Sequence, residues 1–131
     1  MKIFLILFFL TMSSNVMSSD NNLSGKKLLC KDSIKEEAFE FLSWIKVRRH
    51  TFLESSGKYY RDSVSYHYVT DRDTISIYNK ISTWQKSVRI SRITLKRGDG
   101  TQCELTEINL DNHFKSKEDK HFEGIEDKRK I

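Results

Sequence analysis

The sequence contains no proline, five glycines and two cysteines in 131 residues. The cysteines, Cys30 and Cys103, do not form a C-x-x-C motif, which argues against a reactive thiol pair. No serine lies in a G-x-S-x-G motif, and the segment 98–100 is too short for a phosphate-binding loop. The four histidines lack the spacing of metal ligands. We therefore assign no catalytic, cofactor-binding or metal-binding residue and predict that the protein is not an enzyme.

Long apolar runs are also missing, apart from Ile3–Leu10 near the start of the chain. This run is too short for a transmembrane helix, which needs about 20 residues. It follows Lys2 and precedes a small, polar stretch, an order that is typical of a secretory signal peptide. We predict a signal peptide over residues 1–18, cleaved after Ser18, with an uncleaved anchor as the alternative. The expected location is the periplasm or the extracellular space, without a stable membrane anchor.

The chain carries a formal net charge of +5 and has a pI near 9.2. The positive excess lies in the middle of the chain, because the acids and bases of residues 111–131 are balanced. A basic body can attract a polyanion, but a modest excess also keeps a small secreted protein soluble. Export argues against nucleic acid as a partner.

Most of residues 19–110 carries the two-residue alternation of β-strands. Alternation is clear over 60–69 and 74–78, and Asp71–Asp73 between them is typical of a turn. Residues 88–96 alternate with a change of parity, which predicts a β-bulge at Ser91-Arg92. Glycines 98 and 100 predict a turn into a last strand over 102–105. The pattern predicts one all-β domain, a small antiparallel meander that is curled or barrel-like.

Residues 33–52 are compatible with a helix as well as with strands. Ser33 and Glu36 match a helix capping box, and Ile34, Ala38 and Phe41 would share one helical face. The alternation of Phe39-Glu40-Phe41 instead favours a strand.

The C-terminal segment 111–131 contains a near-repeat, in which His113–Lys120 is followed directly by His121–Lys128. One repetition of eight residues does not make a repeat protein. The balanced charge and low apolar content predict a solvated tail that is helical in part.

The short motifs around Leu23–Lys26, Phe39–Phe41, Ile75–Ile77, Ile90–Leu95 and Cys103–Leu105 resemble a group of short exported two-cysteine proteins of unknown function from marine bacteria with AT-rich genomes. The resemblance covers about residues 23–106. It implies an all-β domain in which Phe39–Phe41 lies in a strand and Ser43–Ile45 lies near a hairpin turn. It implies no activity and no site residues.

Cys30 and Cys103 flank nearly all of the strand-like sequence, and an exported protein can form a disulfide. We predict a Cys30–Cys103 bond that ties one edge of the sheet to the other. Aromatic and basic residues are intermixed along the strands, where they can form either a core or a binding face for a sugar or an anionic polymer. The candidate binding patch consists of Tyr66, Tyr68, Trp84, Arg89 and Arg92.

These observations predict an exported, monomeric, non-catalytic binding protein of the periplasm or envelope. Its partner would be a small apolar ligand inside the barrel or an envelope protein at an open sheet edge. One alternative is an inhibitor of a cell-wall hydrolase such as lysozyme, on the analogy of architecture. A small hydrolytic enzyme is the second alternative, and it requires a pocket that holds His67 or a carboxylate with a displaced pKa.

Overall fold

A computed structural model describes residues 22–78 and 88–130. The proposed signal peptide and Trp84 lie outside the described residues. Within them, no helix combines the length and the apolar character that crossing a membrane would need.

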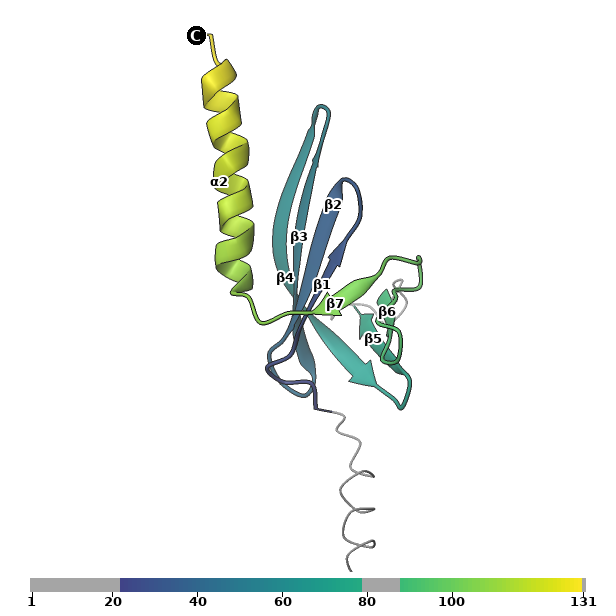
Figure 1. Cartoon of the computed structure of the whole chain (residues 1–131). Coiled ribbons are helices and arrows are strands. Elements are labelled where there is room, and N and C mark those ends of the chain that lie inside the picture. Colours follow the sequence, from purple (N-terminus) through teal and green to yellow (C-terminus); the bar gives the residue numbers. More distant parts are fainter. Residues whose placement is uncertain (1–21, 79–87, 131) are drawn as a thin grey trace, which may run out of the picture.

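Seven antiparallel strands form a single sheet that curls into a half-barrel (Figure 1). The order of the strands across the sheet is β6-β5-β4-β3-β2-β1-β7, so the first six make a meander and the last returns beside the first. The all-β prediction is therefore confirmed. The strands are β1 (Lys27–Lys31), β2 (Lys35–Phe41), β3 (Lys46–Ser55), β4 (Lys58–Thr70), β5 (Thr74–Tyr78), β6 (Val88–Ser91) and β7 (Cys103–Leu105), and one helix, α2 (Leu110–Lys128), follows them.

The ambiguous segment 33–52 forms the hairpin of β2 and β3, with Phe39–Phe41 in a strand and Ser43–Ile45 in the turn, as the resemblance implied. The helix that the capping box at Ser33 and Glu36 predicted does not form. Asp32 instead fixes a turn before β2. Its Oδ1 accepts hydrogen bonds from the backbone N–H groups of Ile34 and Lys35, at 3.0 and 2.8 Å, in an Asx-type turn. β2 then leaves this turn as a strand that pairs with β1 on one side and β3 on the other.

Local turn chemistry also fixes the next two connections. β3 and β4 pair over ten residues each, and Gly57 at the hairpin end has a φ of 77°, which favours glycine. At the β4–β5 turn, Oδ1 of Asp71 accepts from the N–H groups of Asp73 and Thr74, both at 2.9 Å. The predicted turn at Asp71–Asp73 is confirmed.

The predicted β-bulge at Ser91-Arg92 is wrong, because β6 ends at Ser91 and the chain turns there. Oγ of Ser91 accepts from the N–H groups of Ile93 and Thr94, at 3.2 and 3.1 Å, and Leu95 has a φ of 60°. The change of parity in the sequence therefore marks a tight turn. It does not mark a continued strand with one extra residue.

The connection from β6 to β7 links the two edges of the curled sheet. Ile90 bridges to Arg97, Lys96 bridges to Gln102, and the N–H of Cys103 donates to the carbonyl of Leu95 at 2.9 Å. The predicted Cys30–Cys103 disulfide is present, with the two Cα atoms 4.1 Å apart. It joins the neighbouring strands β1 and β7, so the expectation that it ties opposite edges is wrong. The backbone hydrogen bonds of the β6–β7 connection are what link the two edges of the sheet.

The curled sheet has a filled concave side and a convex side that α2 covers in part. Phe39, Phe41 and Tyr68 are among the largest side chains on the concave side, and all three are buried. On the convex side, Leu110 and Phe114 of α2 pack against Leu29, Ala38 and Phe52 of β1–β3. The C-terminal segment is thus a helix, as predicted in part, but one face of its first half is docked on the sheet through Leu110 and Phe114.

Candidate functional site

An open groove of about 260 Å³ lies on the concave side, near the end of the long β3–β4 hairpin. The groove lies next to the apolar core. Toward the hairpin end, the side chains on this face change from aromatic and aliphatic to polar. Antiparallel register places Lys35, Leu53 and Tyr60 in one row across the three central strands, and Glu37, Thr51 and Asp62 in the next. The groove is lined by Lys35, Arg49, Thr51, Leu53, Tyr60, Asp62, Val64 and Tyr66.

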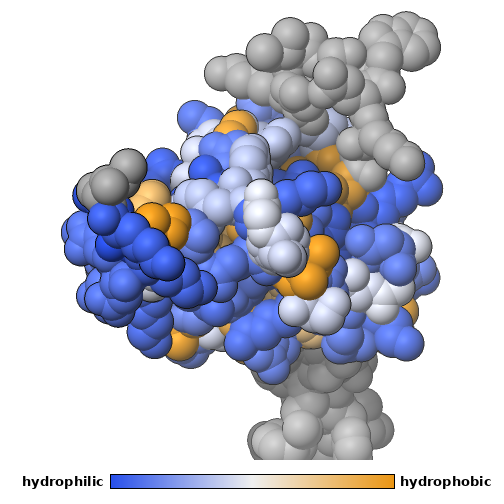
Figure 2. All heavy atoms as spheres, turned by 90° about the horizontal axis from the view of Figure 1, so that it is seen from above, coloured by the Kyte–Doolittle hydropathy of each residue, from blue (hydrophilic) through white to orange (hydrophobic). Residues whose placement is uncertain are grey.

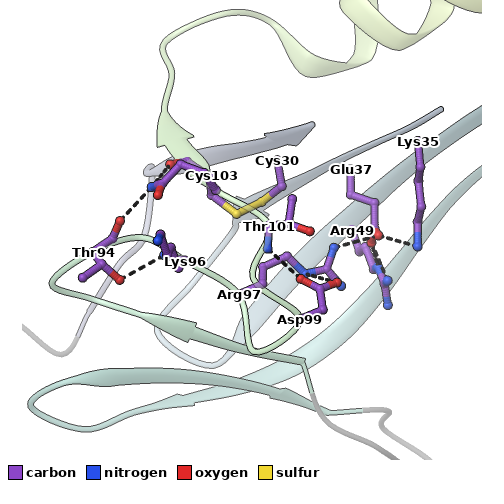
Figure 3. The surroundings of a disulfide bond; sticks show 11 residues. Cys30, Lys35, Glu37, Arg49, Thr94, Lys96, Arg97, Asp99, Thr101 and Cys103 are labelled. Atoms are coloured by element: carbon purple, nitrogen blue, oxygen red, sulfur yellow. Dashed lines mark hydrogen bonds and ion pairs between the residues drawn. A yellow bond between two sulfur atoms is a disulfide. The ribbon is translucent and has the colours of Figure 1, made fainter. Parts of the chain in front are cut away.

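A buried carboxylate organises the wall of this groove. Glu37, whose side chain is 1% exposed, forms ion pairs with Lys35 at 2.6 Å, with Arg97 at 2.8 Å and with Arg49. Figure 3 shows these three cations converging on Glu37, next to the disulfide. The guanidinium groups of Arg49 and Arg97 also lie 5.8 and 5.9 Å from the ring centre of Phe39. The wall is therefore rigid before any ligand arrives.

The ion pairs determine the protonation state of Glu37. Burial alone would raise the pKa of this carboxyl, but hydrogen bonds from Lys35 and Arg97 and the nearby charge of Arg49 outweigh burial, so the pKa lies below its ordinary value. Glu37 is consequently ionised at neutral pH.

The opposite wall is formed by β4, where a tyrosine is hydrogen-bonded to an acid. The hydroxyl of Tyr60 donates to Oδ2 of Asp62 at 2.6 Å, and this hydrogen bond raises the pKa of the Tyr60 phenol. The ring of Tyr60 remains about half exposed at the groove. Asp99 lies 3.8 Å from Arg97, so each cation of the cluster has a carboxylate near it and the groove is polar but close to neutral.

The structure does not bring the predicted binding patch together. Tyr66 lines the groove, whereas Tyr68 is buried in the core, where its hydroxyl donates to the carbonyl of Ser43 at 2.6 Å. Arg89 is exposed on β6 with its neighbours Val88 and Ile90 facing the core, so it lies on the other side of the sheet. Arg92 lies in the turn after β6 and donates to the carbonyl of Asp71 at 2.7 Å.

A second, apolar hollow of about 180 Å³ lies at the opposite end of the concave side. It is smaller than the cavities of about 300–1,000 Å³ that hold most small ligands. Between the two hollows, the chain's own side chains fill the described part of the half-barrel. The lining residues are Leu23, Lys26, Leu28, Phe41, Ile75, Arg92, Leu95 and Leu105.

The convex side holds the other cluster of ionisable groups, at the contact with α2. Glu36 accepts from Lys117 at 2.8 Å and lies 2.7 Å from Nε2 of His113. Burial alone would raise the pKa of Glu36, but these two partners lower it below its ordinary value. His50 is fully buried, stacks on Phe114 with ring centres 5.4 Å apart, and has its pKa lowered by burial. These groups fasten the helix to the sheet and line no groove on the concave side.

Reasoning from the sequence missed Lys35, Arg49 and Tyr60 as groove residues, and Glu37 as the buried carboxylate that holds the wall. Lys35, Glu37 and Arg49 lie in the segment for which helix and strand were both open, so their shared face was not defined. Once β2 and β3 are known to be strands, the alternation of Lys35, Glu37 and Phe39 places both charges on the core face. Arg97 was missed for another reason, since no local pattern relates a turn residue to β2.

These features define an antiparallel half-barrel protein with a docked helix and a polar groove on its concave side. Within residues 22–78 and 88–130, no group of three or more His, Cys, Asp or Glu side chains is arranged to hold a metal ion. No protein-family model, curated protein or solved structure matches the chain. The resemblance to exported two-cysteine proteins stays a prediction.

Proposed function

We propose that this chain is an exported, non-catalytic binding protein of the periplasm or envelope that holds a short saccharide in the concave groove. The observation that carries this proposal is the groove itself, in which half-exposed Tyr60 and partly exposed Tyr66 stand beside Lys35 and Arg49. Phenol rings offer flat surfaces for the C–H faces of a sugar ring. The charged groups offer donors and acceptors for its hydroxyls.

The charge of the groove favours a neutral ligand over a polyanion. The cations Lys35, Arg49 and Arg97 are matched by the acids Glu37, Asp62 and Asp99. Without a net positive field, an anionic polymer would gain little from electrostatic attraction. The groove volume of about 260 Å³ lies just below the range of about 300–1,000 Å³ for most small-ligand sites, so a short saccharide fits it better than a larger ligand.

Two other modes of binding receive less support from the geometry. The apolar side chains of the core occupy the described half-barrel, which leaves little space for an apolar ligand. The connection between β6 and β7 contacts both sheet edges, with Gly98 donating to the carbonyl of Arg89 and Cys103 donating to that of Leu95. A partner strand would have to displace these bonds before it could pair there.

The non-catalytic part of the proposal rests on the protonation state of Glu37, the buried acid of the groove wall. A general acid at neutral pH needs a raised carboxyl pKa, whereas the pKa of Glu37 is lowered and the carboxylate is saturated by three cations. His67 does not line the groove.

Titration with saccharides, followed by NMR chemical shifts and calorimetry, tests the proposal. The probes are oligomers of N-acetylglucosamine, muropeptides and neutral hexose oligomers, with heparin as the polyanion control. We expect one of the neutral probes to shift the signals of the groove residues. Tyr60→Ala should then weaken binding about tenfold, while Tyr60→Phe, which keeps the ring, should bind within about threefold of the parent.

A lysine pair provides a matched control for the charged wall. Lys35→Gln should weaken binding, whereas Lys58→Gln, on the same hairpin but outside the groove, should not. Absence of groove shifts with every saccharide, or equal effects of both lysine changes, would contradict the proposal. Stoichiometric loss of lysozyme activity without saccharide binding would favour the hydrolase-inhibitor alternative.

A further inference from the structure

The turn between β2 and β3 exposes three large apolar side chains at one end of the molecule. Leu42, Trp44 and Ile45 are 39%, 68% and 38% exposed. We call residues 42–45 the Trp44 turn. Turns of this kind usually carry Gly, Asn, Asp or Ser, because these residues suit both the backbone geometry and water. A cluster of exposed apolar side chains is therefore unusual here and indicates contact with another surface.

These exposed apolar side chains lie in a turn whose backbone is fixed by hydrogen bonds. The N–H groups of Leu42 and Ser43 donate to the carbonyl of Lys46 at 2.9 and 3.2 Å, and Oγ of Ser43 accepts from the N–H groups of Ile45 and Lys46. From the core, the hydroxyl of Tyr68 donates to the carbonyl of Ser43. The backbone of the turn is held on both sides, so the Trp44 side chain is presented from a fixed platform.

The beginning of the described chain lies directly beside this turn. Gly25 donates to the carbonyl of Phe41 at 2.8 Å, and Oγ of Ser24 donates to the carbonyl of Leu42 at 3.3 Å. The segments 22–26 and 42–46 contain two charged residues, Lys26 and Lys46, and no acid. Both lysines are exposed, so two cations flank the apolar side chains.

The Trp44 turn lies at the opposite end of β3 and β4 from the hairpin end of the saccharide groove, which is marked by Leu53 and Tyr60. Figure 1 shows the chain entering at the lower end, where β2 runs into β3, while the β3–β4 hairpin and α2 project upward. Seen from above, that upper end is largely hydrophilic, with small and separate apolar patches (Figure 2).

We propose that the Trp44 turn is a contact site for the surface of an anionic lipid bilayer. Tryptophan is favoured at the boundary between headgroups and acyl chains, because its ring is apolar while its N–H can still donate. Leu42 and Ile45 would enter the same layer. Lys26 and Lys46 would lie at the level of the phosphates, where each basic residue adds attraction to an anionic membrane.

The charge pattern selects a bilayer as the occupant. Lys26 and Lys46, the charged residues of these two segments, complement a uniformly anionic surface, whereas a protein partner would usually present charges of both signs. Contact at this end would leave the hairpin end of the groove, at Leu53 and Tyr60, away from the membrane. The inference stands independently of the saccharide proposal.

Binding to vesicles tests this inference, with oxidised protein that was purified after export and checked by intact mass for removal of residues 1–18. The probes are vesicles of phosphatidylglycerol and phosphatidylethanolamine, and vesicles of phosphatidylcholine alone. We expect co-sedimentation with the anionic vesicles that weakens with salt. Trp44→Ser should reduce this binding about tenfold. Ile93→Ser, at a more exposed apolar residue in another turn, is the matched control and should leave it unchanged.

A second measurement uses the fluorescence of the Trp44 indole. Trp84→Phe leaves Trp44 as the only tryptophan of the chain, and its emission should move to shorter wavelength when anionic vesicles are added. Equal binding by the parent and Trp44→Ser, or an unchanged Trp44 emission, would overturn the inference. So would equal binding to phosphatidylcholine vesicles. Failure to bind vesicles together with dimerisation that Trp44→Ser abolishes would assign the turn to a second copy of the chain instead.

Discussion

At the scale of single residues, Glu37 decides the character of the concave side. A carboxylate that is 1% exposed is costly to bury unless it is paired, and three cations from β2, β3 and the β6–β7 connection pair with it here. The cluster has two consequences. It holds Arg97, and with it the turn between β6 and β7, against the central strands. It also sets the wall of the groove in a fixed geometry.

Replacing Glu37 by glutamine should destabilise the fold by about 3 kcal/mol at pH 7, because Arg49 and Arg97 would lose their buried counter-charge. Chemical denaturation measures this loss. Asp99→Asn, which changes an exposed partner of Arg97, is the control and should cost less than about 1 kcal/mol.

Glu37→Gln should also change how the stability of the fold depends on pH. The pKa of Glu37 is lower in the folded chain than in the unfolded chain, so its stabilisation is complete above the unfolded value of about 4.3 and is lost as pH falls through the folded value. The parent should therefore lose more stability than Glu37→Gln between pH 5 and the acid limit of folding. Parallel stability curves for the two proteins would contradict this assignment.

At the scale of elements, the near-repeat of residues 113–128 gives α2 two His-Phe pairs that contact the sheet. His113-Phe114 and His121-Phe122 fall on the side of the helix that meets the sheet. In the first pair, His113 contacts Glu36 and Phe114 is buried; in the second, His121 stacks on Tyr59 with ring centres 4.0 Å apart. Contact is strongest at the N-terminal half, where Asn109 caps the helix by accepting from the N–H of Asn112.

Phe114→Ala should release α2 from the sheet, because a helix of 19 residues is marginal in water once its buried anchor is lost. Removal of the buried ring should cost about 3 kcal/mol. Amide hydrogen exchange over residues 110–128 is the measurement, and protection there should fall while protection in β2–β4 persists. Phe122→Ala, at a half-exposed ring, should have a much smaller effect. Unchanged protection of α2 in Phe114→Ala would show that its anchor lies elsewhere.

At the scale of the whole molecule, the half-barrel depends on how its last strand returns to its first. β7 has three residues and pairs with β1 alone, so few backbone bonds hold it. The Cys30–Cys103 bond adds a covalent link at this point, across a sequence separation of 73 residues. Directly opposite cysteines on adjacent antiparallel strands lie close enough for this bond.

Loss of the disulfide should lower the melting temperature strongly. In the chain-entropy description, a loop of this length contributes roughly 4 kcal/mol, which corresponds to more than about 10 °C for a domain of this size. The double change Cys30→Ser and Cys103→Ser, compared with the oxidised parent by circular dichroism, measures the effect. A melting curve that coincides with that of the parent would refute a stabilising role.

The sequence by itself determined most of the strands and two of the turns, because these depend on local physics. Alternation over 60–69 and 74–78 and the aspartates of 71–73 act through neighbours in the chain. Tertiary structure decided the rest. The segment 33–52 carries both helix and strand signals, and pairing with β1 and β4 on its two sides selects strands. The contact of Arg97 with Glu37 spans 60 residues, and the docking of Phe114 needs a convex face that exists only once the sheet has curled. Local patterns cannot encode such contacts, since they depend on which strands become neighbours.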